Sequence, residues 1–339
     1  MTFTDHLNMI IKGQDLTMDQ MSEMISHILS GNVTDAQIGA FMAALAVKGE
    51  TFEELAGAAR AMRRKAVRIQ TISKTVVDTC GTGGDASGSF NISTTTAFVV
   101  AGCGVTVAKH GNRSISSKCG SADVLEVLGV NINTDPEIVE EAVNEIGIGF
   151  LFAPTFHSAM RHAAKARRDV GIKSIFNMLG PLTNPAAARC QLLGVFAPEL
   201  TEMFARALKL LGAHRAFVVH GHDGMDEITV SAPTRVSELK DGLIRSYDLD
   251  PLEFFDGYAD ARSLRGGDAQ INAAITTSVL KGERGPRRDI VLINSAAALV
   301  AADAADTIKE GMEKASVSID SGKAMEKLEK LATFTQENG

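Results

Sequence analysis

The stretch from Thr75 to Gly129 constrains this chain more than any other part of its sequence. An apolar pair, Val76-Val77, leads into the glycine-dense run Asp78-Thr-Cys-Gly-Thr-Gly-Gly-Asp85. Glycine lets backbone N–H groups approach an anion, because it has no Cβ. Asn91-Ile-Ser-Thr-Thr-Thr96 then opens an apolar helical segment, whose first N–H groups add unpaired donors and a positive partial charge. The pattern predicts a phosphate-binding loop.

A second polar loop follows the next strand-like run, Val105-Thr-Val-Ala108, and has the sequence Lys109-His-Gly-Asn-Arg-Ser-Ile-Ser-Ser117. Its lysine and serine donors match a phosphate or a diphosphate. Loops at the end of a strand commonly carry function, although a solvated surface loop is the alternative here. Two such loops, one strand apart, predict the two halves of one anion site.

Two other nucleotide-binding patterns fit this region poorly. Gly81-Thr-Gly-Gly-Asp-Ala86 formally matches the dinucleotide fingerprint G-x-G-x-x-G/A. The acidic residue expected about twenty residues later is missing, since no Asp or Glu stands between Asp85 and Asp123. The Walker pattern fails because no Gly-Lys-Ser/Thr follows. Phosphate binding is therefore preferred to nicotinamide binding and to a plain tight turn.

Short β-branched runs alternate with helical stretches after Thr75, which predicts an α/β fold with a mostly parallel sheet flanked by helices. Ligands bind beyond the carboxyl ends of the strands in such sheets. We expect the loops Gly81–Ser89, His110–Ser121 and Gly221–Glu227 to occupy that position. The candidate strands are Val76–Asp78, Val105–Ala108, Ala216–His220 and Asp289–Asn294.

The first seventy residues are predicted to be helical. Three helix starts carry a capping box: Thr17 with Gln20, Thr34 with Gln37, and Thr51 with Glu54. The middle helix is apolar nearly all round over Ile38–Val47, so we expect it to pack within its own chain or against a partner subunit. We expect a small all-helical domain over residues 1–70, with the segment 168–190 packed on it, and a larger α/β domain over residues 71–339.

Composition limits the function classes. A chain of 339 residues suggests about two domains, and its net charge of −7 argues against a nucleic-acid partner. No apolar run is long enough to span a bilayer, and Met1 to Ile10 is too polar for a signal peptide. We therefore expect a cytoplasmic protein with reduced thiols. The four cysteines form no CxxC pair and stand at Cys80, Cys103, Cys119 and Cys190.

Adjacent acids, Asp226 and Glu227, follow the run Val218-Val-His-Gly-His222. Hard cations such as Mg²⁺ take carboxylate oxygens and often bridge the protein to a phosphorylated substrate. Without the phosphate loop, an ordinary surface pair would be the better interpretation. The two histidines of that run have no third zinc ligand at a recognisable spacing. Cys80 is interpreted as a small buried thiol rather than a nucleophile.

A basic helix is predicted over His157–Val170. It carries Arg161, Lys165, Arg167 and Arg168, most of which we expect to be solvated or paired. Since arginine binds carboxylates through two hydrogen bonds, at least one of them is a candidate for an anionic second substrate.

Four motifs together resemble the anthranilate phosphoribosyltransferases, and the resemblance covers essentially the whole chain. It implies a helical domain and an α/β domain with the site between them, and a homodimer. It also implies transfer of the 5-phosphoribosyl group from phosphoribosyl diphosphate (PRPP) to the amine of anthranilate, with Mg²⁺, in tryptophan biosynthesis. The motifs are Asp78–Asp85, Lys109–Asp123, Asn177-Met-Leu-Gly-Pro-Leu-Thr-Asn-Pro185 and His220–Glu227.

The resemblance also implies site residues, with His110 as the candidate for a general base and two Mg²⁺ ions per subunit. Ser158 stands where proline is common in the family, and Ser89 where threonine is common. The implied PRPP ligands are Gly81, Gly84, Asp85, Ser89, Asn91, Ile92, Ser93, Thr94, Lys109, His110, Gly111, Asn112, Arg113, Ser114, Ile115, Ser116, Ser117 and Ser121. The implied anthranilate ligands are Gly81, His110, Asn112, Arg167 and Pro181, and the implied metal ligands are Ser93, Asp226 and Glu227.

Two alternative functions remain at this point. A pyrimidine nucleoside phosphorylase shares the architecture by family resemblance, but it would need no paired magnesium acids. A phosphosugar-binding regulator would bind the same ligand without turnover. Depletion of substrate would separate all three.

Overall fold

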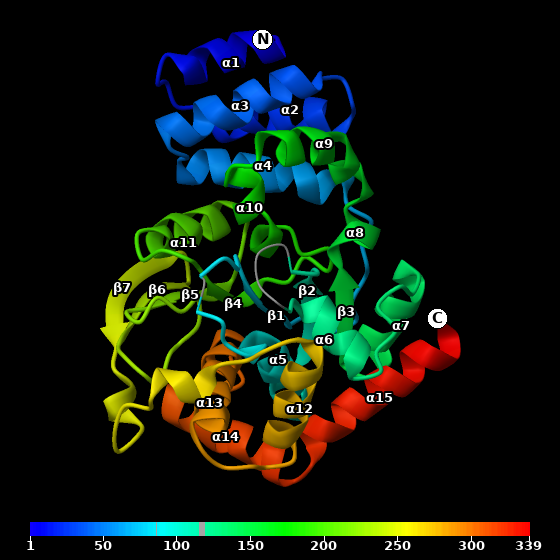
Figure 1. Cartoon of the computed structure of the whole chain (residues 1–339), viewed down its shortest axis with the longest axis vertical. Coiled ribbons are helices and arrows are strands. Elements are labelled where there is room, and N and C mark those ends of the chain that lie inside the picture. Colours follow the sequence, from blue (N-terminus) through cyan, green and yellow to red (C-terminus); the bar gives the residue numbers. More distant parts are fainter. Residues whose placement is uncertain (86, 115–118) are drawn as a thin grey trace.

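The computed structural model describes residues 1–85, 87–114 and 119–339. Figure 1 shows a helical domain, which carries the N-terminus, beyond one end of a larger domain built on a sheet. The predicted fold class is confirmed: a small helical N-terminal domain precedes an α/β domain with a mostly parallel sheet. The expected ligands Ile115, Ser116 and Ser117 lie outside the described residues.

Residues 1–65, all described, form helices that begin at threonine caps. In each cap the threonine hydroxyl accepts a hydrogen bond from a backbone N–H three residues later, and the side chain there bonds back to the threonine N–H. The boxes predicted at Thr17, Thr34 and Thr51 are confirmed, and Thr2 forms another with Asp5. The helices are α1 (Phe3–Ile11), α2 (Met18–Leu29), α3 (Asp35–Lys48) and α4 (Phe52–Lys65).

In the described part of the chain, seven strands form one sheet in the order β3-β2-β1-β4-β5-β6-β7. The pairs from β3 to β5 are parallel, and β6 and β7 are antiparallel additions at one edge. The carboxyl ends of β1, β2 and β5 therefore meet at the same edge of the sheet. The strands are β1 (Val76–Gly81), β2 (Thr106–Gly111), β3 (Ile148–Phe152), β4 (Cys190–Gly194), β5 (Arg215–Gly221), β6 (Thr234–Lys240) and β7 (Leu243–Leu249).

Three of the four candidate strands are confirmed as β1, β2 and β5. The fourth is wrong, because Asp289–Asn294 lies inside helix α13 (Pro286–Ala301). A short apolar run is equally compatible with a buried strand and a buried helix, and its length alone does not decide. The true signal is Pro286 at the first helical position, where its fixed φ and missing N–H suit a helix start.

Helices cover both faces of the sheet (Figure 1). Side chains of a strand alternate between the faces: Leu192 and Val219 join the core on the α13 side, while Leu193 and Val218 join the core on the α11 side. On the first face α5 and α13 contact the strands, and α12 and α14 pack against them. These helices are α5 (Ile92–Gly102), α11 (Leu200–Leu210), α12 (Ala269–Leu280) and α14 (Ile308–Asp320).

Further helices lie around β3 and along the C-terminal part of the chain. Helix α7 packs on β3, and α15 contacts both α5 and α7 (Figure 1). Short 3-10 turns stand between the edge strand β7 and α12. The remaining elements are α6 (Ser121–Val127), α7 (Pro136–Glu145), α15 (Lys323–Asn338), η3 (Pro251–Glu253) and η4 (Ala261–Leu264).

The segment between β3 and β4 returns to the helical domain. Helix α9 packs against α2 and α3, and the ring centroids of Phe176 in α10 and Phe41 in α3 lie 6.4 Å apart. One apolar cluster therefore runs from the helical domain, through this segment, to the α11 face of the sheet. The elements of the segment are α8 (Ala153–Phe156), η1 (Ser158–Met160), α9 (Arg161–Val170), α10 (Ile175–Met178) and η2 (Gly180–Leu182).

The basic helix expected from His157 begins four residues later, at Arg161. The backbone of His157 is not helical, with φ −119° and ψ 47°, and its side chain is buried. A 3-10 turn over Ser158–Met160 separates it from α9.

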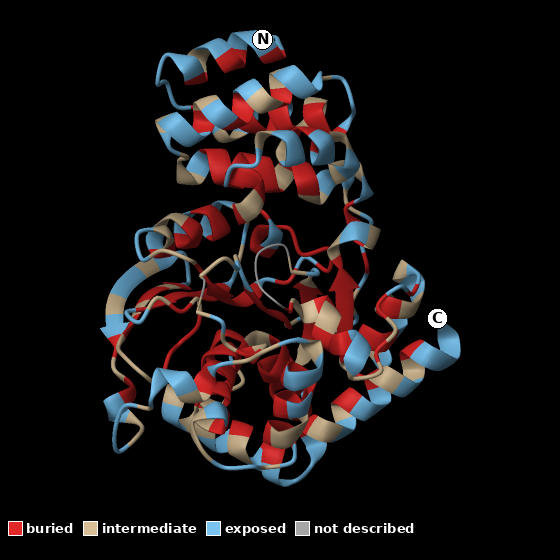
Figure 2. Cartoon of the chain, viewed as in Figure 1, coloured by how far each residue is buried: buried red, intermediate tan, exposed pale blue. Residues whose placement is uncertain are grey.

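Figure 2 shows the strands of the sheet as largely buried, with β7 exposed at the edge. The β-branched and leucine side chains of the parallel strands face helices on both sides, so these strands read as nearly continuous apolar runs. None of the helices in the described ranges has the length and apolar character needed to cross a bilayer.

Candidate active site

The loop that follows β1 lies at the carboxyl edge of the sheet, as predicted. Gly83 and Gly84 have φ of +66° and +77°, a backbone conformation that disfavours side chains. The N–H of Gly83 donates to Oδ2 of Asp226 at 3.0 Å. The glycine loop is therefore joined directly to the acidic pair after β5, which the sequence only placed at the same edge.

Close backbone approach makes this junction possible. A Cβ on Gly81 would lie 2.7 Å from Oδ2 of Asp226, and a Cβ on Gly194 would lie 1.6 Å from the Asp226 carbonyl oxygen. The backbone N–H of Asp226 donates to Oδ2 of Asp85 at 3.4 Å. Glycine at the ends of β1 and β4 is thus what lets the acidic loop sit against the sheet.

The carboxyl groups of Asp85, Asp226 and Glu227 gather here with the Lys109 ammonium. Burial, and then repulsion from Asp85, raise the pKa of Asp226. Burial, and then repulsion from Asp226, raise the pKa of Glu227, while Lys109 lowers it. Buried carboxylates that repel one another gain from a bound cation. Within the described residues, no group of three or more His, Cys, Asp or Glu forms a metal site by itself.

Lys109 is the buried cation of the site. Its Nζ donates to the Thr79 carbonyl oxygen at 2.5 Å and to Oγ of Ser93 at 3.3 Å. Burial lowers the pKa of Lys109, and the Asp78 and Glu227 carboxylates act in the opposite direction. The ammonium group therefore lies between the acids and the N-terminus of α5.

The start of α5 carries the residues expected to contact phosphate. Ile92, Ser93 and Thr94 form its first turn, whose N–H groups have no partner within the helix. Asn91 is the cap residue, but its side chain makes no cap bond. Its Oδ1 instead accepts from Nδ2 of Asn272 at 2.8 Å. Ser89 forms an isolated antiparallel bridge with Arg265, and its hydroxyl accepts a hydrogen bond from the Ser87 hydroxyl at 3.2 Å.

The second loop packs onto the start of α6. The Ser121 hydroxyl donates to the Asn112 carbonyl oxygen at 3.2 Å, and a Cβ on Gly111 would meet that hydroxyl at 2.2 Å. The Arg113 guanidinium binds two acids of α6, Asp123 at 2.9 Å and Glu126 at 2.5 Å. The backbone N–H of Ser114 also donates to Asp123, at 3.2 Å.

His110, the residue after Lys109 on β2, lies against the turn η2 that follows α10. Its Nδ1 is 3.0 Å from the Gly180 carbonyl oxygen, which can only accept, so Nδ1 carries the proton and Nε2 presents a lone pair. The His157 ring stacks edge-on at 5.0 Å between centroids. Burial lowers the pKa of His110 to about 3 and that of His157 to about 4, and His157 contributes to the shift of His110.

In each of these histidine rings, one nitrogen lacks a hydrogen-bond partner among the described residues. The Nε2 atoms of both rings are buried and contact no hydrogen-bond partner among the described residues. Pro181 follows the Gly180 carbonyl, and its own carbonyl oxygen accepts from Nε2 of Gln191 at 2.8 Å. His157, which the sequence suggested only as a helix start, therefore forms a buried pair with His110.

Arg167 stands on α9, in the segment that packs on the helical domain. Its guanidinium lies 5.5 Å from the centroid of the Phe176 ring, and it forms no ion pair with any described carboxylate. Burial lowers its pKa, which marks the cost of keeping this charge without an anion. Arg168 is exposed on the same helix.

One contact of the site had no signal in the sequence. The Lys173 ammonium, between α9 and α10, lies 3.5 Å from the Gly84 carbonyl oxygen and 4.8 Å from the centroid of the Phe196 ring. It links the segment packed on the helical domain to the glycine loop. A single lysine in a turn resembles any solvated lysine, so only the tertiary structure reveals it.

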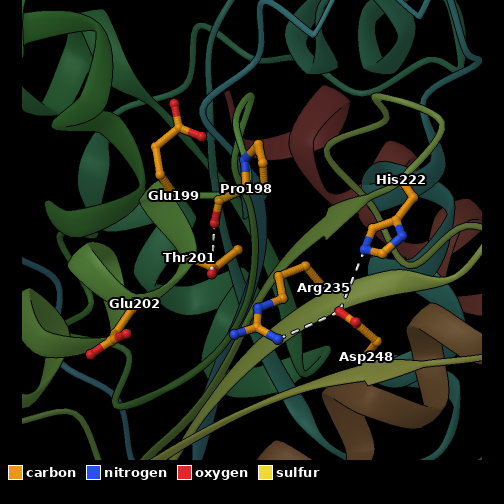
Figure 3. Close-up of a pocket in the computed structure, with 7 residues that line it drawn as sticks. All are labelled: Pro198, Glu199, Thr201, Glu202, His222, Arg235 and Asp248. Carbon is orange, nitrogen blue, oxygen red and sulfur yellow. Dashed lines mark hydrogen bonds and ion pairs between the residues drawn. The ribbon is translucent and has the colours of Figure 1, made fainter.

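A separate pocket lies outside this region, on the β6–β7 side of the sheet (Figure 3). Within it, Asp248 is 3.4 Å from Nε2 of His222 and 3.6 Å from Arg235. The acids Glu199 and Glu202 face the same opening from the start of α11. None of the residues that line it was predicted to bind substrate.

The comparison with protein families agrees with this architecture. Residues 4–66 match the helical bundle domain of a glycosyl transferase family, and residues 73–325 match the a/b domain of that family. The fold and this match define a two-domain glycosyltransferase.

Individual relatives narrow this class. Anthranilate phosphoribosyltransferase of Syntrophobacter fumaroxidans is 66% identical over 334 residues, which cover 98% of this chain and 99% of the relative. The crystal structure of the Thermus thermophilus enzyme has a TM-score of 0.92 and 42% identity, over 97% of this chain and 99% of that one. The Saccharomyces cerevisiae enzyme in complex with PRPP and Mg has a TM-score of 0.90 and 28% identity, over 99% and 98%.

The chain belongs to the anthranilate phosphoribosyltransferase family. The expectation drawn from its motifs is thereby confirmed, and a phosphoribosyl-transferring enzyme of tryptophan biosynthesis is favoured over a pyrimidine nucleoside phosphorylase and over a regulator without turnover.

Proposed function

We propose that this chain transfers the 5-phosphoribosyl group of PRPP to the amine of anthranilate at the carboxyl edge of β1, β2 and β5. The products are N-(5-phosphoribosyl)anthranilate and diphosphate. The observation that carries the proposal is the junction of the glycine loop with the acidic loop, where Gly83 N–H meets Asp226. It brings phosphate-binding backbone and metal-binding carboxylates within one hydrogen bond of each other.

The diphosphate side is the first turn of α5 and the buried Lys109. Diphosphate gains negative charge as the glycosidic bond breaks, while the ribose carbon becomes cation-like. Preorganised donors aimed at the leaving group stabilise that separation without reorganising. The Lys109 ammonium is such a donor, and the N-terminus of α5 adds a positive partial charge.

Magnesium fits the carboxylates of this edge, which repel one another in a buried setting. Asp226 and Glu227 would hold it, with the Ser93 hydroxyl, and we propose two ions per subunit. When bound, the metal neutralises charge on the diphosphate. Mg²⁺ commonly uses one or two carboxylates and completes its shell with waters and substrate phosphates, which suits Asp226 and Glu227 as the proposed acidic ligands. The yeast relative complexed with PRPP and Mg supports this proposal.

Anthranilate would bind on the other side, towards the helical domain. We assign its carboxylate to Arg167, which forms no ion pair with any described acid. The ring and the amine would be surrounded by Asn112, His110, Pro181 and Gly81. An amine held against the ribose carbon gains from proximity alone.

The His110 ring serves as a hydrogen-bond acceptor in this scheme. Its lowered pKa keeps it neutral at pH 7, with Nδ1 bound to Gly180. The Nε2 lone pair is buried and has no partner among the described residues, so it would accept from an amine N–H once a bound substrate reaches it. A base this weak orients the amine rather than storing its proton. The aryl amine can release its proton after attack on the ribose carbon.

We also propose a homodimer formed through the helical domain. On α3 an apolar face is exposed, whereas the opposite face is buried; the exposed residues are Ala36, Ala40, Ala43 and Val47.

We also propose that the chain divides into residues 1–70 and 71–339, with segment 168–190 packed on the first part. The contact of Phe176 with Phe41 supports this division. Reduced thiols at all four cysteines favour the cytoplasm.

Two isosteric substitutions test the metal role. Asp226→Asn and Glu227→Gln each remove one negative charge and keep the size of the side chain. We expect turnover to fall about a hundred- to a thousandfold, because a major charge-stabilising contact is lost. Rates are measured against Mg²⁺ concentration by the loss of anthranilate fluorescence, and high Mg²⁺ should restore part of the loss.

Asp256→Asn is the matched control, since it removes one charge from an exposed residue between η3 and η4. Its rate curve against Mg²⁺ should overlay that of the wild type. Identical curves for the wild type and the Asp226→Asn/Glu227→Gln double variant would refute the metal assignment.

A further inference from the structure

The acidic pair belongs to a loop without regular secondary structure. Residues 222–233 lie between β5 and β6, so their backbone groups have no ladder partner in the sheet. Ile228, directly after Glu227, is fully buried. A buried peptide group without a partner costs free energy comparable to a lost hydrogen bond, so Ile228 needs both a donor and an acceptor from elsewhere.

Asn294 of α13 provides both. The Ile228 N–H donates to Oδ1 of Asn294 at 3.0 Å, and Nδ2 of Asn294 donates to the Ile228 carbonyl oxygen at 2.8 Å. The second Nδ2 hydrogen donates to the carbonyl of Ile290, one turn earlier in the same helix, at 2.8 Å. The amide therefore pairs with Ile228 as a neighbouring strand would, and the helix fixes its orientation.

Few other side chains can make this pairing. A carboxylate accepts but does not donate, and an aliphatic side chain does neither. Asparagine in a helix interior lowers helix propensity, yet Asn294 sits in the middle of the 16-residue helix α13, fully buried. The residue is thus unfavourable for the helix itself and useful only to the loop it holds.

Helix α13 connects this loop to the other side of the metal site. It packs against β1, β4, β5 and α5, the helix that begins at Ile92 and carries Ser93. The Asp226 carbonyl lies so close to Gly194 of β4 that a Cβ would not fit there. The loop is therefore held by β4 on one side and by α13 on the other. A shift of the Ile228 peptide would be passed directly to the Glu227 backbone.

We propose that Asn294 is a positioning residue for the reaction: it holds the Ile228 peptide so that Asp226 and Glu227 face the metal and the diphosphate. The inference rests on the proposed function, because it assigns Asn294 to the same metal site. It predicts that Asn294 controls metal affinity through Glu227 and Asp226, beyond any effect on folding.

The test compares Asn294→Ala and Asn294→Ser with Ile293→Ala, a buried apolar neighbour on the same helix. Free energies of unfolding in urea identify variants with equal loss of stability. Mn²⁺ binding in the presence of PRPP, without anthranilate, is followed by electron paramagnetic resonance. We expect the Asn294 variants to bind Mn²⁺ about 10- to 100-fold more weakly, and Ile293→Ala to bind it as the wild type does.

A double-variant cycle shows whether the effect passes through the carboxylates. In the Glu227→Gln background, Asn294→Ala should weaken Mn²⁺ binding little further, because the group that it positions is already altered. An undiminished effect in that background would overturn the proposal. Equal Mn²⁺ affinity of Asn294→Ala and a stability-matched Ile293→Ala would overturn it as well.

Two measurements on the wild type complete the test. If it binds no Mn²⁺ with PRPP, the proposed metal site fails, and the role of Asn294 falls with it, which is distinguishable from failure of Asn294 alone. If the Asn294 variants do not fold, amide exchange in the wild type decides: the Ile228 N–H should exchange only by global unfolding. Exchange as fast as that of an open loop would refute the pairing.

Discussion

At the scale of single residues, burial determines which charges the site can hold. His110 and His157 touch each other, and both are kept neutral because burial penalises the imidazolium. Arg167 keeps its charge but stands over an aromatic ring without a carboxylate. Two neutral histidines and an arginine without a described carboxylate partner suit a substrate with one carboxylate and a neutral amine.

The Arg167 assignment predicts a substrate-specific defect. Arg167→Ala should raise the KM for anthranilate about 10- to 100-fold and leave the KM for PRPP nearly unchanged, because a hydrogen-bonded charge pair contributes about 1.5–3 kcal/mol. Steady-state kinetics with each substrate varied in turn gives both constants. Arg168→Ala, on the exposed side of the same helix, is the control. Equal increases in both KM values would assign Arg167 to the wrong substrate.

His157 predicts a dependence of stability on pH. Its pKa falls from 6.5 in the unfolded chain to about 4 in the folded one, so below pH 6.5 the unfolded state binds more protons. The contribution of His157 to the free energy of unfolding is fully present above pH 6.5. It is lost as the pH falls towards 4, by at most about 1.4 kcal/mol per pH unit.

Asp78, Asp226 and Glu227 act in the opposite sense, because burial raises their pKa values. The measurement is therefore a difference: urea unfolding of the wild type and His157→Asn at pH 7.5, 6 and 5. The wild type should lose more stability than the variant as the pH is lowered. Parallel curves would mean that His157 is accessible to protons in the folded state.

At the scale of elements, close contact between strand ends and loops builds the site. Gly194→Ala should displace the acidic loop, since its Cβ would lie 1.6 Å from the Asp226 carbonyl oxygen. We expect a loss of about 1–3 kcal/mol in the free energy of unfolding. Turnover should fall at least about a hundredfold, because misplacement by 1 Å is enough for that.

The matched change is Gly257→Ala, where a new Cβ meets nothing within 4 Å and φ is not positive. Urea unfolding and turnover of this variant should match the wild type. Wild-type activity in Gly194→Ala would show that the loop tolerates displacement and is not held against β4.

Sequence patterns at this scale predicted the element that carries a ligand better than the element that only supports it. The glycine loop, the start of α5 and the threonine caps depend on local chemistry, which stands in consecutive residues. The run Asp289–Asn294 was mistaken for a strand because burial on most sides removes the helical period. Asn294 gave no signal either, because its partner Ile228 is 66 residues away in the sequence.

The site residues also fall into two groups: those that local sequence predicts and those that depend on distant contacts. The positions of Lys109, Ser93 and Asp226 follow from their places near the ends of strands and helices. The structure joins Lys109 to Ser93, and Asp226 to Gly83 of the glycine loop. The neutral state of His110 depends on Gly180 and His157, which arrive from a distant segment. Such contacts depend on tertiary packing, and no spacing in the sequence encodes them.

At the scale of the whole molecule, the exposed apolar face of α3 predicts assembly. Val47→Glu with Ala40→Glu would place two charges on that face, so a dimer formed there should dissociate. Sedimentation velocity at micromolar concentration should show a dimer for the wild type and a monomer for the variant. Val317→Glu, exposed on α14 far from the helical domain, should remain dimeric. A wild type that sediments as an active monomer would contradict the proposed assembly.

The apolar cluster that joins Phe41 of α3, Phe176 of α10 and Leu193 of β4 has a consequence for how the protein melts. Side chains shared by two lobes cannot leave one lobe without exposing apolar surface on the other. The helical lobe is thus not a detachable module, and neither lobe should survive the loss of its neighbour intact. Heating should give one calorimetric peak, whose van't Hoff enthalpy equals the integrated heat for each cooperative unit.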